Sequence, residues 1–268
     1  MSRYNRPSVA QQIRSSQGEI IGSLNNALDI HDANSHRSIV NRYAHQHTAT
    51  VTTLAADSAI NAYQITVASA TGFAVGNYIH INTTTEETTH PKITAIAGAV
   101  FTLDRRLDNV HLIGDSVTKS ILDMSTTAGT MAAPQEYWAG PPAGSVWHLT
   151  RLLFSMVHGT AGDLGLFGNL TALTNGAVLR VRLNGIYTTL TDWKTNADFK
   201  SDMYDVDFDA RSGGGGVYGT SGRGTFKASG SVVRLDGDTS DRIEVYIQDD
   251  ITALNLFRMK FQGHLENA

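Results

Sequence analysis

Apolar residues near the N-terminus recur at the spacing of an amphipathic helix. Five of them, spaced by four or seven positions, share one stripe: Val9, Ile13, Ile20, Leu24 and Leu28. Ser8 can cap such a helix, whereas Gly18 and Gly22 each lower its stability by about 1 kcal/mol. We therefore predict a helix over residues 8–30 of an N-terminal anchoring arm, followed by an extended connector. The stripe needs a surface to cover it, either on a neighbouring subunit or on the chain's own domain.

Further along, the pattern changes to short segments in which apolar and polar residues alternate. Tyr63, Ile65 and Val67 share one face of such a segment. Turn residues separate the segments, namely Gly72, Gly76, Pro91, Gly98 and Gly114. Gly98 marks a tight hairpin between residues 93–96 and 100–103. Four or five short strands here predict a small, curled β-barrel, with a small sandwich as the alternative.

The C-terminal half is again rich in short β-segments, and its clearest element is a hairpin. Asn184-Gly185 supplies the two residues of a type I′ turn. Pairing about this turn sets Leu183 opposite Ile186, and Leu179 opposite Leu190, on one apolar face. Seven or eight such strands predict an antiparallel sandwich of the jelly-roll type.

Together these patterns predict a mainly β fold in four parts. A stretch of small residues and prolines separates the two β-regions. It predicts a linker, or a strap that lies over the second β-region. The four parts are the arm with its helix (residues 1–48), the small β-barrel (49–124), the linker (125–145) and the jelly-roll-like β-sandwich (146–268).

Composition removes several classes of protein. Charged residues form only 17% of the chain, and the net charge of -4 offers no basic surface for nucleic acid. No apolar run approaches the roughly 20 residues that cross a bilayer, so we expect no membrane insertion. The first 19 residues lack the apolar centre of a signal peptide. Cysteine is absent, which excludes disulfides, thiolate metal ligands and cysteine nucleophiles.

The glycine-rich stretch Tyr204–Phe226 allows three interpretations. Its Gly214-x-Gly216-x-x-Gly219 spacing matches a dinucleotide fingerprint, but the sequel "TSGRGTFKASG" cannot form the helix that the fingerprint requires. The same segment begins with three alternating aspartates that imitate the start of a calcium-binding loop. The plainest interpretation is a strand that ends in a surface loop, with Val206 and Phe208 inward and the aspartates outward.

Two acidic segments invite a calcium interpretation. Asp205, Asp207 and Asp209 match the first ligand positions of a calcium loop, but the required glycine and the final glutamate are missing. The segment Asp236–Asp241 also fails that template. A looser site between these two segments stays open, since calcium accepts irregular sets of oxygen ligands. No cofactor is predicted.

Catalytic patterns are weak. "GTSGR" lacks the last glycine of a nucleophile elbow, and no α/β alternation surrounds it. Five carboxylates include possible glycosidase pairs, but spacing alone cannot set their separation: Glu136, Asp163, Asp192, Asp198 and Glu244. Four aromatic residues could stack on sugar faces, although filling the core suits their bulk better: Tyr137, Trp138, Trp147 and Trp193. We therefore predict that the chain is not an enzyme.

His45-x-His47 is the candidate metal site. On a strand, two residues of this spacing point to one face. One pair is too few for a structural metal, which usually takes four ligands, but a trimer would bring six imidazoles to its axis. The alternative is a polar connector with ordinary exposed histidines.

Two quoted segments resemble the small β-modules of tailed-bacteriophage virion proteins. They are "ITVASATGFAVGNYIHI" and "ITAIAGAVFTLDRRLDNVHLIGDSV", within Ile65–Val117. The C-terminal segments "FGNLTALTNGAVLRVRLNG" and "IQDDITALNLFRMKFQGHLEN" are also similar to phage structural proteins. "HQH" resembles the His-x-His pairs with which phage fibres hold a metal across their axis.

The resemblance implies a virion structural protein of the tail, baseplate or fibre, assembled in the host cytoplasm and anchored by its arm. The alternative location in the virion is the head exterior, where the chain would be a capsid decoration (cement) protein. The alternative functional class is an enzyme, an envelope-glycan depolymerase. Its expected partners are other virion proteins, further copies of the chain, with a trimer favoured, and a host cell-surface glycan.

Overall fold

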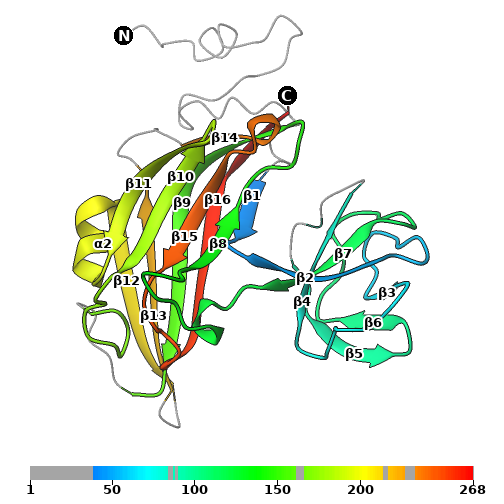
Figure 1. The fold of residues 1–268 in the computed structure, drawn as a ribbon, viewed down its shortest axis with the longest axis horizontal. Coiled ribbons are helices and arrows are strands. Elements are labelled where there is room, and N and C mark those ends of the chain that lie inside the picture. Colours follow the sequence, from blue (N-terminus) through cyan, green and yellow to red (C-terminus); the bar gives the residue numbers. More distant parts are fainter. Residues whose placement is uncertain are drawn as a thin grey trace, which may run out of the picture.

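The computed structural model of the chain describes residues 39–83, 87, 90–160, 166–213, 217–226 and 233–267. The helix predicted over residues 8–30 lies outside the described residues. The described part is mainly β and consists of two bodies, a large sandwich and a smaller β module (Figure 1). No helix among the described residues is long and apolar enough to span a membrane.

Two antiparallel sheets form the sandwich. The six-stranded sheet has the order β1 (Ile39–Tyr43), β16 (Leu254–Asn267), β9 (Ser145–His158), β13 (Val217–Thr225) and β12 (Tyr204–Gly213), with β14 (Val233–Asp236) also on β9. The four-stranded sheet has the order β11 (Ile186–Trp193), β10 (Ala177–Leu183), β15 (Arg242–Ile247) and β8 (Gln135–Ala139). The predicted antiparallel sandwich is therefore confirmed, while its jelly-roll class stays a prediction.

Aromatic packing joins the two sheets and the short helix α2 (Asn196–Asp202). The ring of Trp193, on β11, lies 4.6 Å from that of Phe154 on β9 and 4.9 Å from that of Phe199 on α2. Its indole N–H donates to the side-chain oxygen of Asn196, so the buried ring leaves no polar atom unpaired. Tyr137 and Trp147 are buried as well, as the core-filling interpretation predicts. Trp138 is partly exposed.

The smaller module contains two three-stranded antiparallel sheets around one apolar core. One has the order β2 (Gln46–Thr53), β7 (Ser116–Ile121) and β4 (Tyr78–Asn82), and the other β3 (Gln64–Thr66), β6 (Val100–Leu103) and β5 (Ile93–Ala97). The predicted closed barrel is wrong for the described strands. Closure needs one continuous ladder around the axis, and among the described residues only isolated bridges, Leu54 with Val67 and Tyr78 with Lys92, link the edges of the two sheets.

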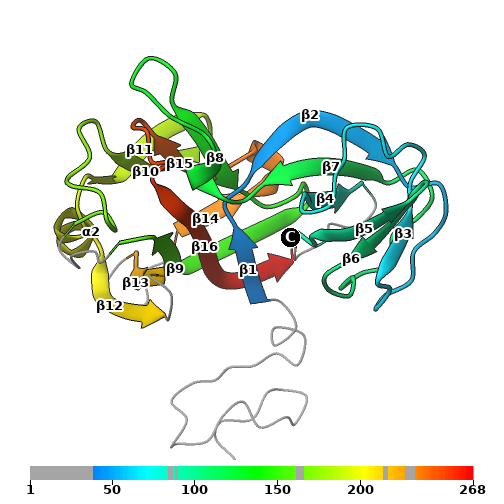
Figure 2. The ribbon, with the colours of Figure 1, turned by 90° about the horizontal axis from the view of Figure 1, so that it is seen from below.

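The module is inserted into the sandwich. The chain leaves β1 for β2, builds the module, and returns through the short 3-10 helix η2 (Met124–Thr126) to β8. β1 and β8 are edge strands of the two sandwich sheets, and they meet β2 between the two bodies (Figure 2). Of the predicted arm, residues 1–48, the described part therefore contains the sandwich strand β1 and the start of β2. The predicted linker, residues 125–145, contains β8.

Both predicted tight turns form. Gly98 has φ +61° between β5 and β6, and Asn184 and Gly185 have φ +50° and +81° between β10 and β11. Leu183 faces Ile186 as predicted. The prediction that Leu179 faces Leu190 is wrong, because a register shift after Leu179 pairs it with Thr191. Such a bulge adds one unpaired residue to a strand, which pure alternation does not reveal.

The segment that begins at Tyr204 forms the hairpin of β12 and β13. Val206 and Phe208 are half-buried against the sandwich core, while Asp205, Asp207 and Asp209 are exposed. The interpretation of this stretch as an ordinary strand is therefore confirmed for its described residues. The central loop residues, 214–216, lie outside them.

Gly222 on β13 tests how tightly this hairpin packs. A Cβ atom there would lie 2.3 Å from a ring carbon of Phe154 and 2.9 Å from one of Phe208. We expect Gly222→Ala to lower the free energy of unfolding by about 1–3 kcal/mol, because overpacking displaces both rings. Urea unfolding measures the change.

Gly219→Ala is the matched control on the same strand. Its added Cβ would meet only the carbonyl oxygen of Met156, at 3.8 Å, which is an ordinary contact. Equal losses in the two variants would contradict the packing explanation.

Candidate metal centre

Four histidines gather where the inserted module joins the sandwich. His45 links β1 to β2, His47 lies in β2, His80 in β4, and His90 shortly before β5. The ring of His45 lies 4.3 Å from that of His47 and 4.6 Å from that of His90. The ring of His80 lies 4.9 Å from His47 and 5.1 Å from His90. We call these four residues the histidine cluster.

Strand alternation and pairing bring three of the rings together. His45 and His47 share one face, two positions apart. Across the β2-β7-β4 sheet, His47 pairs with Ser120, and His80 pairs with Thr118 two positions earlier on β7. The small side chain of Ser120 lies between β2 and β4 on this face, so the two imidazoles can meet above β7.

His90 completes the cluster from a different direction. It precedes Pro91, whose carbonyl accepts a hydrogen bond from the N–H of Ile79 on β4. The backbone of His90 has φ +42°, in the left-handed region that side chains other than glycine seldom adopt. Such a conformation costs roughly 1–3 kcal/mol and must be held by its surroundings.

The cluster contains buried imidazole nitrogens without hydrogen-bond partners. His45 is 4% exposed and His90 is 1% exposed. Nδ1 of His45 lies 3.3 Å from the carbonyl of Tyr43. Among the described residues, no hydrogen-bond partner is present for the Nε2 of His45, the Nε2 of His47 or either nitrogen of His90. An unsatisfied buried polar group costs about 1–3 kcal/mol, and native proteins keep few of them.

One nitrogen from each of His45, His47 and His90 forms a compact donor set. These three atoms lie within 4.8 Å of one another. A tetrahedral zinc site, with Zn–N bonds of about 2.0–2.1 Å, holds its ligand atoms roughly 3.3–3.4 Å apart. Modest rotation of the three side chains toward a common centre therefore produces a coordinating arrangement.

Burial keeps these imidazoles neutral, which is the form that binds a metal. It lowers the pKa of His45 and of His90 well below 6.5, and the neighbouring imidazoles lower both further. Burial, followed by His47, Arg42 and His111, lowers the pKa of His80 to about 3. The pKa of His47 is also lowered by burial.

The sequence found half of this cluster. The predicted pair, His45 and His47, lies within it, and the fold brings His80 and His90 of the same chain to the pair. Alternation in "NYIHIN" places His80 on a strand but gives no partner, and the sequence around His90 carries no ligand spacing. Whether the pair also meets copies of itself across a trimer axis stays a prediction.

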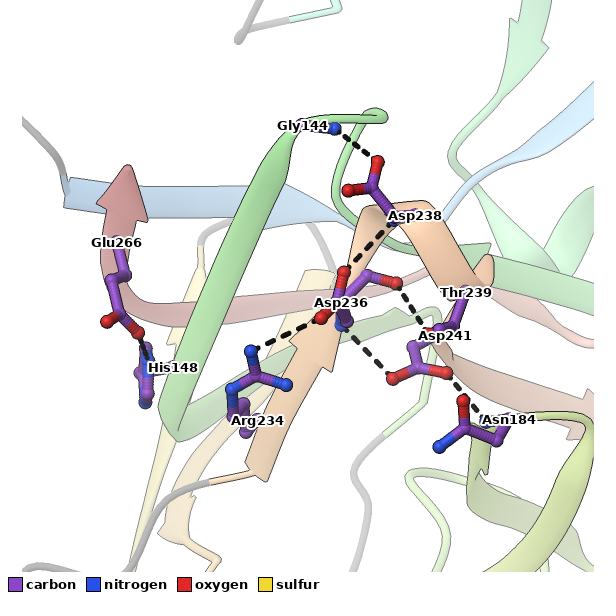
Figure 3. A network of polar contacts seen from close by, with 9 residues as sticks. All are labelled: Gly144, His148, Asn184, Arg234, Asp236, Asp238, Thr239, Asp241 and Glu266. Atoms are coloured by element: carbon purple, nitrogen blue, oxygen red, sulfur yellow. Dashed lines mark hydrogen bonds and ion pairs between the residues drawn. The ribbon is translucent and has the colours of Figure 1, made fainter. Parts of the chain in front are cut away.

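The carboxylates of the acidic segment Asp236–Asp241 accept hydrogen bonds from backbone N–H groups of the segment itself and of two neighbouring loops (Figure 3). Asp236 accepts from the N–H of Asp238 in the 3-10 helix η3 (Gly237–Thr239), and Asp238 accepts from the N–H of Gly144. Asp241 accepts from the N–H groups of Asn184 and Asp236. Elsewhere, Asp207 pairs with Arg223 and Asp209 with Arg211. Within the described residues, these acidic groups do not assemble into a cation site.

The candidate catalytic carboxylates are also engaged in structural contacts. Glu244 is fully buried and binds the guanidinium groups of Arg180 and Arg242, and Arg242 also binds Glu136. Asp198 forms a capping box with Thr195 at the start of α2. Asp192 is exposed beside Lys194, and Asp163 lies outside the described residues.

Comparisons with protein-family models, with curated proteins and with solved structures find no match to this chain. Residues Ile65–Val117, which carry the resemblance to phage virion modules, form most of the small β module. The resemblance itself stays a prediction.

Glu244→Gln tests the structural role of the buried carboxylate. The amide cannot neutralise Arg180 and Arg242, so we expect the free energy of unfolding to fall by about 3 kcal/mol. Glu136→Gln is the matched control, because its side chain is 30% exposed and such pairs contribute up to about 1 kcal/mol. Urea unfolding of both variants compares them, and a stable Glu244→Gln protein would contradict this role.

The lowered histidine pKa values predict a pH dependence of stability. Above the unfolded pKa of about 6.5, the cluster is neutral in both states and contributes no pH dependence. Below pH 6.5, these histidines bind protons in the unfolded chain, whereas in the folded chain they stay neutral. We expect the free energy of unfolding to fall as the pH drops from 6.5 to 5, by up to about 1.4 kcal/mol per pH unit for each buried histidine.

Unfolding curves in EDTA, measured between pH 5 and 8, give this slope. His80→Asn should reduce it, because one of the buried imidazoles is then missing. His264→Asn, which removes an exposed histidine of β16, should change the slope much less. A slope equal in all three proteins would refute the assignment to the cluster.

Proposed function

We propose that the chain is a structural subunit of a tailed-bacteriophage virion, located in the tail, baseplate or fibre, and that it has no catalytic activity. The observation that carries the proposal is the insertion of a β module, whose sequence resembles virion modules, between two edge strands of a β-sandwich. Such a chain offers two separate β surfaces for assembly. Anchoring is assigned to the N-terminal side and contacts with partner subunits or a host glycan to the rest.

The position of β1 supports anchoring at this side. β1 is an edge strand of the six-stranded sheet and pairs with β16, so that Ile39 faces His264. Within the described residues, β1 therefore has a sheet neighbour on one side only, and such an edge is a surface that an added strand can extend. Ile39 is 71% exposed at this edge. A symmetric homo-oligomer, with a trimer favoured, would use the same edge in every copy.

Exposed apolar side chains on two paired segments of the module support contacts with partner subunits. They belong to Ile60, Val110, Leu112 and Ile113, which are 43% to 65% exposed. Backbone bonds between Ser58 and His111 hold the two segments together. Apolar side chains grouped on a surface are typical of protein interfaces. We call these four residues the module patch.

The carboxylates support a role without catalysis. Glu136, Glu244 and Asp198 are held in ion pairs or a helix cap, which leaves none of them as a general acid beside a free base. This distinguishes the proposal from the depolymerase alternative, which needs two carboxyl groups across one substrate site.

Particles made from the genome that encodes the chain test this proposal. We expect the chain in purified particles at a few copies each, as counted by quantitative mass spectrometry. Ile113→Asp should reduce its incorporation by about tenfold or more, because a charge in a buried contact is costly. Val75→Asp is the matched control: Val75 is 61% exposed but lies outside the module patch.

The other outcomes separate the alternatives. A copy number that scales with capsomers would instead support the capsid decoration protein. Release of sugars from host envelopes by the purified chain would support the depolymerase. Absence from purified particles would refute a virion role altogether.

A further inference from the structure

The histidine cluster has features that packing alone does not explain. It buries imidazole nitrogens that have no hydrogen-bond partner within the described part of the chain, and it holds His90 at a positive φ. The first feature costs stability unless another group satisfies the nitrogens, and the second costs stability as backbone strain. A metal ion bonded to these nitrogens would remove the first cost and offset the second.

We propose that His45, His47 and His90 of one chain bind a divalent transition-metal ion, and that this ion is zinc. The proposal is independent of any virion role. It differs from the pairing of His45 and His47 across a symmetry axis, because all three ligands belong to one chain.

The donor set selects the class of metal. Three neutral imidazoles suit zinc, copper, nickel or iron, whereas calcium and magnesium prefer oxygen ligands that the set lacks. Zinc has no geometric preference of its own and accepts three protein nitrogens with a fourth ligand such as water. His47 is only half-buried, so solvent can supply that ligand from its side. Arg42 acts on the cluster as a nearby positive charge. Its repulsion lowers the affinity of the site for a divalent cation.

The ligands come from segments that a metal would usefully join. His45 pairs by backbone hydrogen bonds with Trp138 of the sandwich edge strand β8. His47 belongs to the first strand of the module, and His90 precedes β5 in the module's other sheet. One ion would therefore fasten both sheets of the module to the point where the chain leaves the sandwich.

Zinc titration of the purified chain tests the proposal. Isothermal calorimetry of protein previously treated with EDTA should show one zinc per chain, and zinc should raise the melting temperature. Cobalt(II) in place of zinc should give the visible absorption of a tetrahedral nitrogen site. His90→Asn should weaken zinc binding by at least about 100-fold, since loss of even an outer-shell partner costs 10–100-fold.

The pair His148 and His264 provides the matched control. Their rings stack at 5.0 Å on the six-stranded sheet, and His148 binds Glu266, but they are not part of the donor set. The double variant His148→Asn and His264→Asn should bind zinc with unchanged stoichiometry. Far-ultraviolet circular dichroism verifies that each variant is folded.

Three results would overturn the proposal. They are the absence of zinc binding to the unaltered chain, a stoichiometry of one zinc per three chains, and undiminished binding by folded His90→Asn protein. The first and second use the unaltered chain, so they decide the question even if the variant fails to fold. None of them bears on the presence of the chain in virions.

Discussion

Backbone pairing at the crossing between the two β bodies is the constraint on which the rest of the structure depends. The N–H of His45 donates to the carbonyl of Trp138, and the N–H of Trp138 donates back, each over 2.9 Å. The N–H of Ala44 donates to the carbonyl of Met259. The outgoing and returning segments are thereby held side by side. The module meets this condition because its first and last strands, β2 and β7, pair with each other.

The crossing also concentrates polar chemistry. Elsewhere the module and the sandwich are each centred on an apolar cluster, and Trp193 and its aromatic neighbours join the sandwich sheets. Between the bodies, His47 of β2, His80 of β4 and His90 before β5 place imidazoles together instead. The rings of His45 and His47 contact Trp138 in tilted and edge-on arrangements, yet their nitrogens require partners. A junction built in this way is well packed but leaves hydrogen-bonding or ligand positions to fill.

Carboxylates elsewhere in the chain have a different part. Asp236, Asp238 and Asp241 accept from backbone N–H groups and fix the loop after β14 to two other loops. Glu244 neutralises two arginines within the four-stranded sheet. Because each of these groups already has partners in the folded chain, it stabilises loops and strands. These carboxylates of the sandwich are thus consistent with an assembly role. The proposed metal site uses none of them, because its ligands are the histidines between the two bodies.

Local patterns in the sequence determined the β-rich fold, the turns at Gly98 and Asn184-Gly185, and the inward side of β12, because alternation and turn chemistry act over a few residues. They did not reveal the bulge after Leu179, the two three-stranded sheets in place of a barrel, or the insertion between β1 and β8. They placed His45 and His47 on one face. Only the tertiary structure brought His90 to them, because that contact depends on how two sheets pack, and no local spacing encodes it.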